Sequence, residues 1–205
     1  MAYLAYKSYV IAGVGALALA TAAPASLITL SDASSEPGVD ASLLDATMEF
    51  TVAGTTLTLT VTNNTSGANS FKMNELYFNA PDGVTLLFDG LAGWNMATGA
   101  AAGMFGVFDF ALLDGQGGSP NQITAGETVS FTFTILTGTP TMNDFVSEFS
   151  TIPPGDMPAI VAAKFVQGPG DASAFGAVTI PSPGALALLA AAGLVSSGRR
   201  RRRRA

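Results

Sequence analysis

The sequence predicts an all-β fold, an antiparallel β-sandwich, with an apolar segment at each end of the chain. Apolar and polar residues alternate with a period of two in the middle of the chain, which places apolar side chains on one face of a strand. Gly, Pro, Asn and Asp separate these stretches at short intervals. The two ends lack this alternation and contain no acidic residue, so they are expected to serve a different purpose.

The first 25 residues have the layout of a secretory signal peptide, expected to be helical. Lys7 is the only early charge, an apolar run covers Val10 to Leu19, and the small residues of Ala23-Pro24-Ala25 fit a cleavage site. This pattern predicts Ser26 as the mature N-terminus, and cleavage after Ala22 is an alternative. The export translocon and signal peptidase are the implied partners. A buried N-terminal helix of the domain is the competing interpretation, but such a helix rarely lacks a polar face.

The next part of the chain, residues 26–179, is expected to form one β-sandwich domain. Leu57, Leu59 and Val61 alternate with Thr within Thr55–Asn63, as expected for a half-buried strand. In the strand before Thr55 the same alternation places Met48, Phe50 and Val52 inward, and Ala53-Gly54 is the expected hairpin turn. In Glu127–Leu136 it places four residues inward, namely Val129, Phe131, Phe133 and Ile135. Further strands are predicted at Phe71–Asn79, Gly83–Phe88, Gly106–Leu112, Ala159–Gln167 and Phe175–Ile180, and one helix at Asp144–Ser150. The stretch Asn121–Phe133 resembles the turn and strand start that are common in immunoglobulin-like and jelly-roll modules of exported bacterial proteins.

Composition excludes several kinds of chemistry. The 205 residues include no Cys and no His, so a disulfide framework, a Cys- or His-based zinc site and a Ser-His-Asp or Cys-His catalytic unit are all excluded. The acids lie between Asp32 and Asp171, where only Lys72 and Lys164 are basic, so this part carries 2 − 15 = −13. No cofactor is expected, and the acidity argues against a nucleic-acid partner.

Carboxylates are the remaining groups that could support catalysis or bind a metal. Most are expected in turns, and Asp82, Asp89 and Asp114 each precede a Gly there, where Asp satisfies nearby backbone N–H groups. We therefore expect no catalytic residues and no enzyme, with a hydrolase that uses carboxylates alone as the remaining catalytic alternative. For metals, Asp109 and Asp114 with the loop Gly115–Gly118 are weak candidate ligands for calcium, which prefers oxygen.

Two aromatic side chains are candidates for a carbohydrate contact. Trp94, the only Trp, is expected in a surface loop that spans Leu91–Gly106, where it could stack on a sugar or plug the end of the core. Tyr77 is a second candidate for stacking on polysaccharide. The overlapping sequons of Asn63–Ser66 are interpreted as a turn rather than as glycosylation sites.

The last 26 residues have three parts in a fixed order. Pro181-Ser182-Pro183-Gly184 comes first, an apolar run of small residues and Leu follows, and a cationic cluster closes the chain. The cluster consists of Arg199, Arg200, Arg201, Arg202, Arg203 and Arg204, expected to stop translocation on the cytoplasmic side. As a helix the apolar run would be about 20 Å long, short of the roughly 30 Å hydrocarbon core, which suits a transient membrane span.

This ending resembles a PEP-CTERM sorting signal, found on many exported proteins of bacteria that make extracellular polymer. In that family a Pro-Glu-Pro motif precedes the membrane span, and here Ser182 occupies the position of Glu. The resemblance covers residues 180–205. It implies processing by an exosortase, an integral-membrane protease, after transient anchoring in the inner membrane, and delivery to the cell surface or the extracellular space.

The sequence therefore predicts an exported, non-enzymatic protein of the cell envelope or extracellular matrix. A carbohydrate-binding module, with extracellular polysaccharide as its partner, is one alternative. A surface protein held permanently by its C-terminal tail is another, because an apolar run followed by Arg is also the pattern of a simple anchor.

Overall fold

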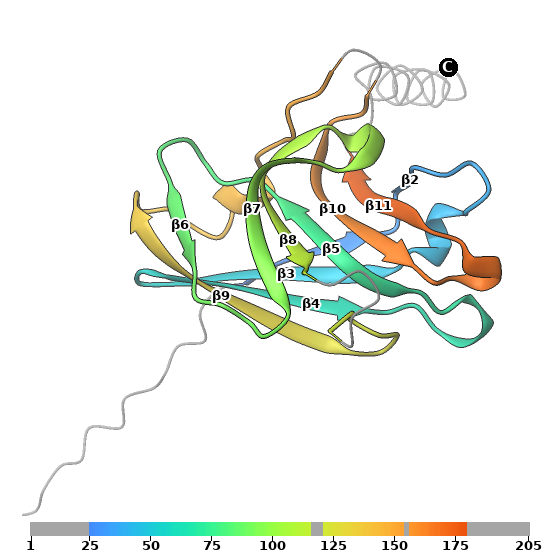
Figure 1. The fold of residues 1–205 in the computed structure, drawn as a ribbon. Coiled ribbons are helices and arrows are strands. Elements are labelled where there is room, and N and C mark those ends of the chain that lie inside the picture. The colour runs from blue at the N-terminus through green and yellow to red at the C-terminus, as the bar shows by residue number, and fades with distance from the viewer. Residues whose placement is uncertain (1–24, 116–120, 154–155, 180–205) are drawn as a thin grey trace, which may run out of the picture.

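The structure is a computed structural model that describes residues 25–115, 121–153 and 156–179. Within these residues the fold is all-β and consists of two antiparallel sheets that pack face to face (Figure 1). The five-stranded sheet has the order β1 (Ala25–Leu30), β3 (Ala46–Ala53), β4 (Thr56–Asn63), β9 (Thr128–Thr137) and β6 (Thr85–Phe88). The six-stranded sheet has the order β2 (Ala33–Ser34), β11 (Ala174–Thr179), β10 (Ala159–Val166), β5 (Lys72–Phe78), β8 (Val107–Asp114) and β7 (Trp94–Ala101). The predicted all-β architecture is confirmed at this level.

The β3–β4 hairpin shows why the alternating sequence folds as it does. Its strands pair in continuous register from Ala46 opposite Asn63 to Ala53 opposite Thr56. The loop therefore consists of Gly54 and Thr55, one residue later than predicted, and Gly54 has φ of +61°. Only glycine adopts such a backbone angle at little cost, and a two-residue loop of this kind matches the twist of the paired strands.

The main core lies between the sheets and is rich in phenylalanine. The predicted inward residues Leu57, Leu59, Val61, Phe131 and Phe133 are all buried. Phe78 of the six-stranded sheet contacts Phe50 and Phe133 of the five-stranded sheet, with ring centroids 5.8 and 5.5 Å apart. Each such ring contributes roughly 1.5–3 kcal/mol through burial alone, so these contacts hold the two sheets together.

A second apolar cluster covers part of the outer face of the six-stranded sheet. It contains Tyr77, Phe105 and Phe108 together with several alanines of β8, β10 and β11. The turn around the 3-10 helix Gly103–Phe105 covers this cluster, and the segment before β10 holds the turn in place. Ser150 Oγ donates to Phe105 O at 2.6 Å, and Met157 N donates to Met104 O at 2.9 Å. The sandwich thus has apolar packing on both faces of one sheet.

Three strands were not predicted from the sequence, namely β1, β2 and β7. The clearest correction concerns β7, because the expected surface loop Leu91–Gly106 contains an eight-residue strand paired with β8 from Trp94 to Ala101. Its sequence is too rich in Gly and Ala to show an apolar alternation. Pairing with the buried strand β8, rather than its own residue pattern, accounts for this strand.

The predicted helix at Asp144–Ser150 was wrong. This segment contains only a three-residue 3-10 helix, Asp144–Val146. The Asp144 carboxylate accepts hydrogen bonds from the N–H and the hydroxyl of Thr141, and Phe145 is buried in the main core. The other 3-10 helices in the described residues are Ala41–Leu43, Gly67–Asn69, Gly103–Phe105 and Pro169–Asp171.

The terminal segments predicted from the sequence lie outside the described residues. They include the signal peptide up to residue 24, the motif Pro181–Gly184 and the Arg199–Arg204 run. Among the residues that the structure does describe, no helix has the length and apolarity needed to cross a membrane.

Candidate functional site

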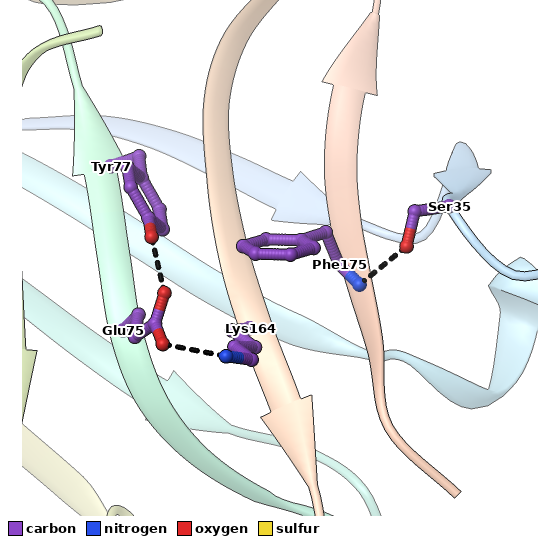
Figure 2. A network of polar contacts seen from close by, with 5 residues as sticks. All are labelled: Ser35, Glu75, Tyr77, Lys164 and Phe175. Carbon is purple, nitrogen blue, oxygen red and sulfur yellow. Dashed lines mark hydrogen bonds and ion pairs between the residues drawn. The ribbon is translucent and has the colours of Figure 1, made fainter. Parts of the chain in front are cut away.

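A network of charged and aromatic side chains occupies the outer face of the six-stranded sheet (Figure 2). Glu75 of β5 lies opposite Lys164 of β10 in the strand register. Lys164 Nζ donates to Glu75 Oε1 at 2.8 Å, and the Tyr77 hydroxyl donates to Glu75 Oε2. The carboxylate therefore has one donor on each oxygen, and both donors come from the same face of the sheet.

Burial sets the chemical character of Tyr77. Desolvation, together with its hydrogen bond to the Glu75 carboxylate, raises the pKa of Tyr77 far above the ordinary value of 10. Its ring lies between those of Phe108 and Phe175, with centroids 5.7 and 5.9 Å away. The phenol therefore remains protonated and acts only as a hydrogen-bond donor. With 3% of its surface exposed, Tyr77 cannot present a face on which a sugar could stack.

The ion pair is partly open to solvent. The side chains of Lys164 and Glu75 are 32% and 19% exposed, and the Lys164 ammonium lies 5.5 Å from the ring centroid of Phe175. The Phe175 backbone is itself bonded to the residue that follows β2, because its N–H donates to Ser35 Oγ at 2.9 Å. The network therefore locks β5, β10 and β11 together and leaves a small charged surface over them.

Trp94 lies in the core and not in an exposed loop. It is 5% exposed, its ring packs edge-on against Phe131 at 5.0 Å between centroids, and its indole N–H donates to Asn121 O at 3.1 Å. The ring and the N–H of the indole thus both make contacts within the protein. The structure places Trp94 as a plug at the end of the sandwich and removes it as a candidate for stacking on a sugar.

Asp109 and Asp114 do not converge on one cation. Both lie on β8, but they are five residues apart and therefore separated by roughly 17 Å along the strand. The Asp109 carboxylate accepts from Ala80 N at 3.1 Å, whereas both carboxylate oxygens of Asp114 are buried without a hydrogen-bond partner. Over the described ranges no three acidic side chains lie close enough to hold a metal ion.

Two shallow hollows lie on the surface of the described residues, and acidic side chains line both. One, of about 260 Å³, is lined by Asp82 and Asp109 together with Ala80, Pro81, Gly83, Val84 and Phe110. The other, of about 180 Å³, is lined by Asp45, Asn64 and neighbouring hydroxyl side chains. Both are smaller than the clefts of about 300–1,000 Å³ that usually enclose a small ligand. Neither contains a nucleophile paired with a base.

Asn63 is a structural residue that the sequence reasoning did not find. It is completely buried, and its amide donates to Phe71 O and Ile123 O, both at 2.9 Å. Its carbonyl oxygen accepts from Thr65 N and Thr65 Oγ at 3.1 and 2.7 Å. All the hydrogen-bonding capacity of the side chain is therefore used inside the protein, which fits the prediction that Asn63–Ser66 forms a turn.

Comparison with known proteins gives no further identification. No protein-family model, no curated protein and no solved structure matches this chain. The sequence and the geometry of the described residues are therefore the basis for any assignment of function.

Proposed function

We propose that this chain is an exported, non-enzymatic protein of the cell envelope or extracellular matrix, sorted through its C-terminal segment. The observation that carries the proposal is the order of three elements in the sequence. A Pro-Ser-Pro-Gly motif precedes an apolar run, and six Arg follow it. This order resembles a PEP-CTERM signal and implies a transient span that is processed by an exosortase-like membrane protease.

The use of the acidic residues supports a structural role. Asp40 accepts from the N–H and the hydroxyl of Ser42, which lowers the pKa of its carboxyl. Glu127 accepts in the same way from Thr124, and Asp144 from Thr141. These carboxylates stabilise turns, and Glu75 is paired with Lys164. Such arrangements are what a scaffold needs, since each removes an unsatisfied donor from a loop or sheet.

The charge of the domain agrees with an extracellular location. Lys72 and Lys164 are the basic residues among residues 26–179, which also contain all fifteen acids, so the net charge is 2 − 15 = −13. This acidity favours solubility after release and opposes direct contact with polyanionic polymers. An acidic extracellular polysaccharide would be reached only through bridging cations.

The intact mass of the protein isolated from its native cell tests this function, because it locates both ends of the mature chain at once. We expect a product that begins at or near Ser26 and has lost Arg199–Arg204. The same gene expressed in a host without the processing protease should give a product that keeps the Arg run. If the native product also keeps it and stays in the membrane fraction, the chain is a permanently anchored protein and the sorting proposal is wrong.

A matched pair of variants connects the processing to the motif. Pro181→Ala combined with Pro183→Ala should leave the C-terminal segment uncut in the native cell. Pro158→Ala, which lies before β10 and outside the motif, should be processed like the parent. Equal processing of all three proteins would show that the Pro-Ser-Pro sequence does not direct the cut.

A further inference from the structure

Three buried oxygen atoms in the six-stranded sheet have no hydrogen-bond partner among the described residues. They are both carboxylate oxygens of Asp114, the last residue of β8, and the amide oxygen Oδ1 of Asn74 on β5. Buried polar atoms nearly always have a partner, and an ionised carboxylate that is buried without one is strongly destabilising. A cation bound to these oxygens removes that penalty, so they mark a candidate ligand site.

The strand register brings the two residues together. β5 and β8 pair up to Glu75 opposite Leu113, and the next residues on the two strands are Asn74 and Asp114. Side chains that lie opposite each other on antiparallel strands have Cβ atoms about 4.5–5.5 Å apart, which is close enough for both to contact one ion. On its other side Asn74 is the extra residue of a β-bulge against β10. Bulges of this kind re-aim a side chain and are common beside binding sites.

The surroundings of Asp114 provide no positive charge within the described part of the chain. Its neighbour on β7 is Trp94, which belongs to the main core, and Leu112, two residues earlier on β8, belongs to it as well. Residues opposite each other in a ladder share a face of the sheet, so Asp114 is on the inner, apolar face. The ion pair formed by described residues is Lys164 with Glu75. No described basic side chain therefore neutralises the Asp114 carboxylate.

We propose that Asp114 and Asn74 bind a calcium ion. Both carboxylate oxygens of Asp114 and Oδ1 of Asn74 are its protein ligands, and water fills the other coordination positions. Carboxylate and amide oxygens are the ligands that Ca²⁺ prefers, and its flexible coordination accepts a bidentate carboxylate. Mg²⁺ requires near-ideal octahedral geometry and gives up its water reluctantly, so it fits this pair less well. With a single carboxylate the expected dissociation constant is about 10⁻⁴–10⁻³ M, the range of extracellular calcium-binding modules.

Terbium luminescence tests the site in the full chain, purified in a mild non-ionic detergent. Tb³⁺ replaces Ca²⁺ at oxygen sites and emits light when a nearby indole is excited. Trp94 is the only Trp of the chain and lies opposite Asp114, so it is the donor for this transfer. We expect sensitised emission that millimolar Ca²⁺ abolishes and the same concentration of Mg²⁺ does not. A lack of sensitised emission, or equal displacement by Mg²⁺, overturns the proposal.

A matched pair of variants connects the ion to the two residues. Asp114→Asn removes the charged ligand, and Asp109→Asn makes the same charge change on the same strand, at a carboxylate that accepts from Ala80 N. The calcium dissociation constant should be the same for the parent and Asp109→Asn and at least about tenfold higher for Asp114→Asn, since ligand charge sets calcium affinity. Asn74→Ala should raise it by about threefold or more. Equal dissociation constants for Asp114→Asn and Asp109→Asn contradict the assignment.

Thermal unfolding provides a second measurement. Calcium at about 10 mM exceeds the expected dissociation constant at least tenfold, so it should raise the melting temperature of the parent and of Asp109→Asn by about 3 °C or more over KCl of equal ionic strength. Asp114→Asn should show no such shift, and Asn74→Ala takes its place if Asp114→Asn does not fold. The same calcium shift in all variants also overturns the proposal. Neither measurement depends on whether the C-terminal segment is processed, so this inference and the proposed function can fail separately.

Discussion

Replacement of Asn63 by Ala should destabilise the protein more than any change at its exposed neighbour Asn64. Asn63 makes four buried hydrogen bonds, at 2.9, 2.9, 3.1 and 2.7 Å. Each contributes a net of about 0.5–1.5 kcal/mol, so their total lies between about 2 and 6 kcal/mol. The adjacent Asn64 makes one exposed hydrogen bond, to Asp45 at 3.2 Å, and Asn64→Ala should cost less than about 0.5 kcal/mol.

The former hydrogen-bond partners of Asn63 narrow the expected loss of stability in Asn63→Ala, because most of them keep another partner. Ile123 O still accepts from Met73 N at 3.0 Å, and the Thr65 hydroxyl, no longer bonded to Asn63, is free to donate to Phe71 O at 3.1 Å. Only Thr65 N loses its side-chain acceptor without a remaining partner in the described residues. We therefore expect a loss of about 3 kcal/mol, in the lower half of that range, which is still a large fraction of the 5–15 kcal/mol typical of a domain.

Urea unfolding followed by circular dichroism measures this difference. With a slope of about 2 kcal/mol per molar, Asn63→Ala should lower the urea midpoint by about 1.5 M and Asn64→Ala by about 0.25 M or less. If Asn63→Ala does not fold, Thr65→Val removes the hydroxyl alone and should give a smaller, measurable shift. Equal midpoints for Asn63→Ala and Asn64→Ala would refute the assignment of the buried hydrogen bonds as a main source of stability.

Two further predictions concern the buried aromatic side chains. Because burial raises the pKa of Tyr77 in the folded state, its contribution to stability is complete below the unfolded value of about 10 and is lost as the pH rises above it. The free energy of unfolding should therefore fall more steeply at alkaline pH for the parent than for Tyr77→Phe, and parallel profiles would contradict the assignment. The 5% exposed Trp94 should resist acrylamide quenching until the protein unfolds, and its emission should not change when soluble polysaccharide is added. A polysaccharide-dependent change in emission would restore the sugar-stacking interpretation.

The sequence predicted those strands in which the alternation of apolar and polar residues matches the alternation of buried and exposed side chains in the fold. Leu57, Leu59 and Val61 alternate with Thr, and the structure buries all three between the sheets. The expected strands around them are present because alternation places one face toward a core wherever the strand lies. β7 and β2 could not be found in this way, since their residues acquire strand geometry from their neighbours β8 and β11.

The candidate site depended on contacts between residues distant in sequence. Glu75 and Lys164 are 89 positions apart, and only the β5–β10 register brings them within 2.8 Å. The sequence left Trp94 as a possible ligand contact, and only the structure shows that it is a core residue. Phe131, which packs against its ring, lies on the other sheet and is distant in sequence.

The sequence by itself determined the all-β class, the inward faces of the regular strands and the absence of any Cys or His chemistry, because these follow from composition and local periodicity. It is also the source of the export and sorting proposal, which rests on the two ends of the chain. The tertiary structure decided which polar side chains are buried and which carboxylates are paired. Those properties depend on how segments far apart in sequence pack together, and a local pattern does not encode that packing.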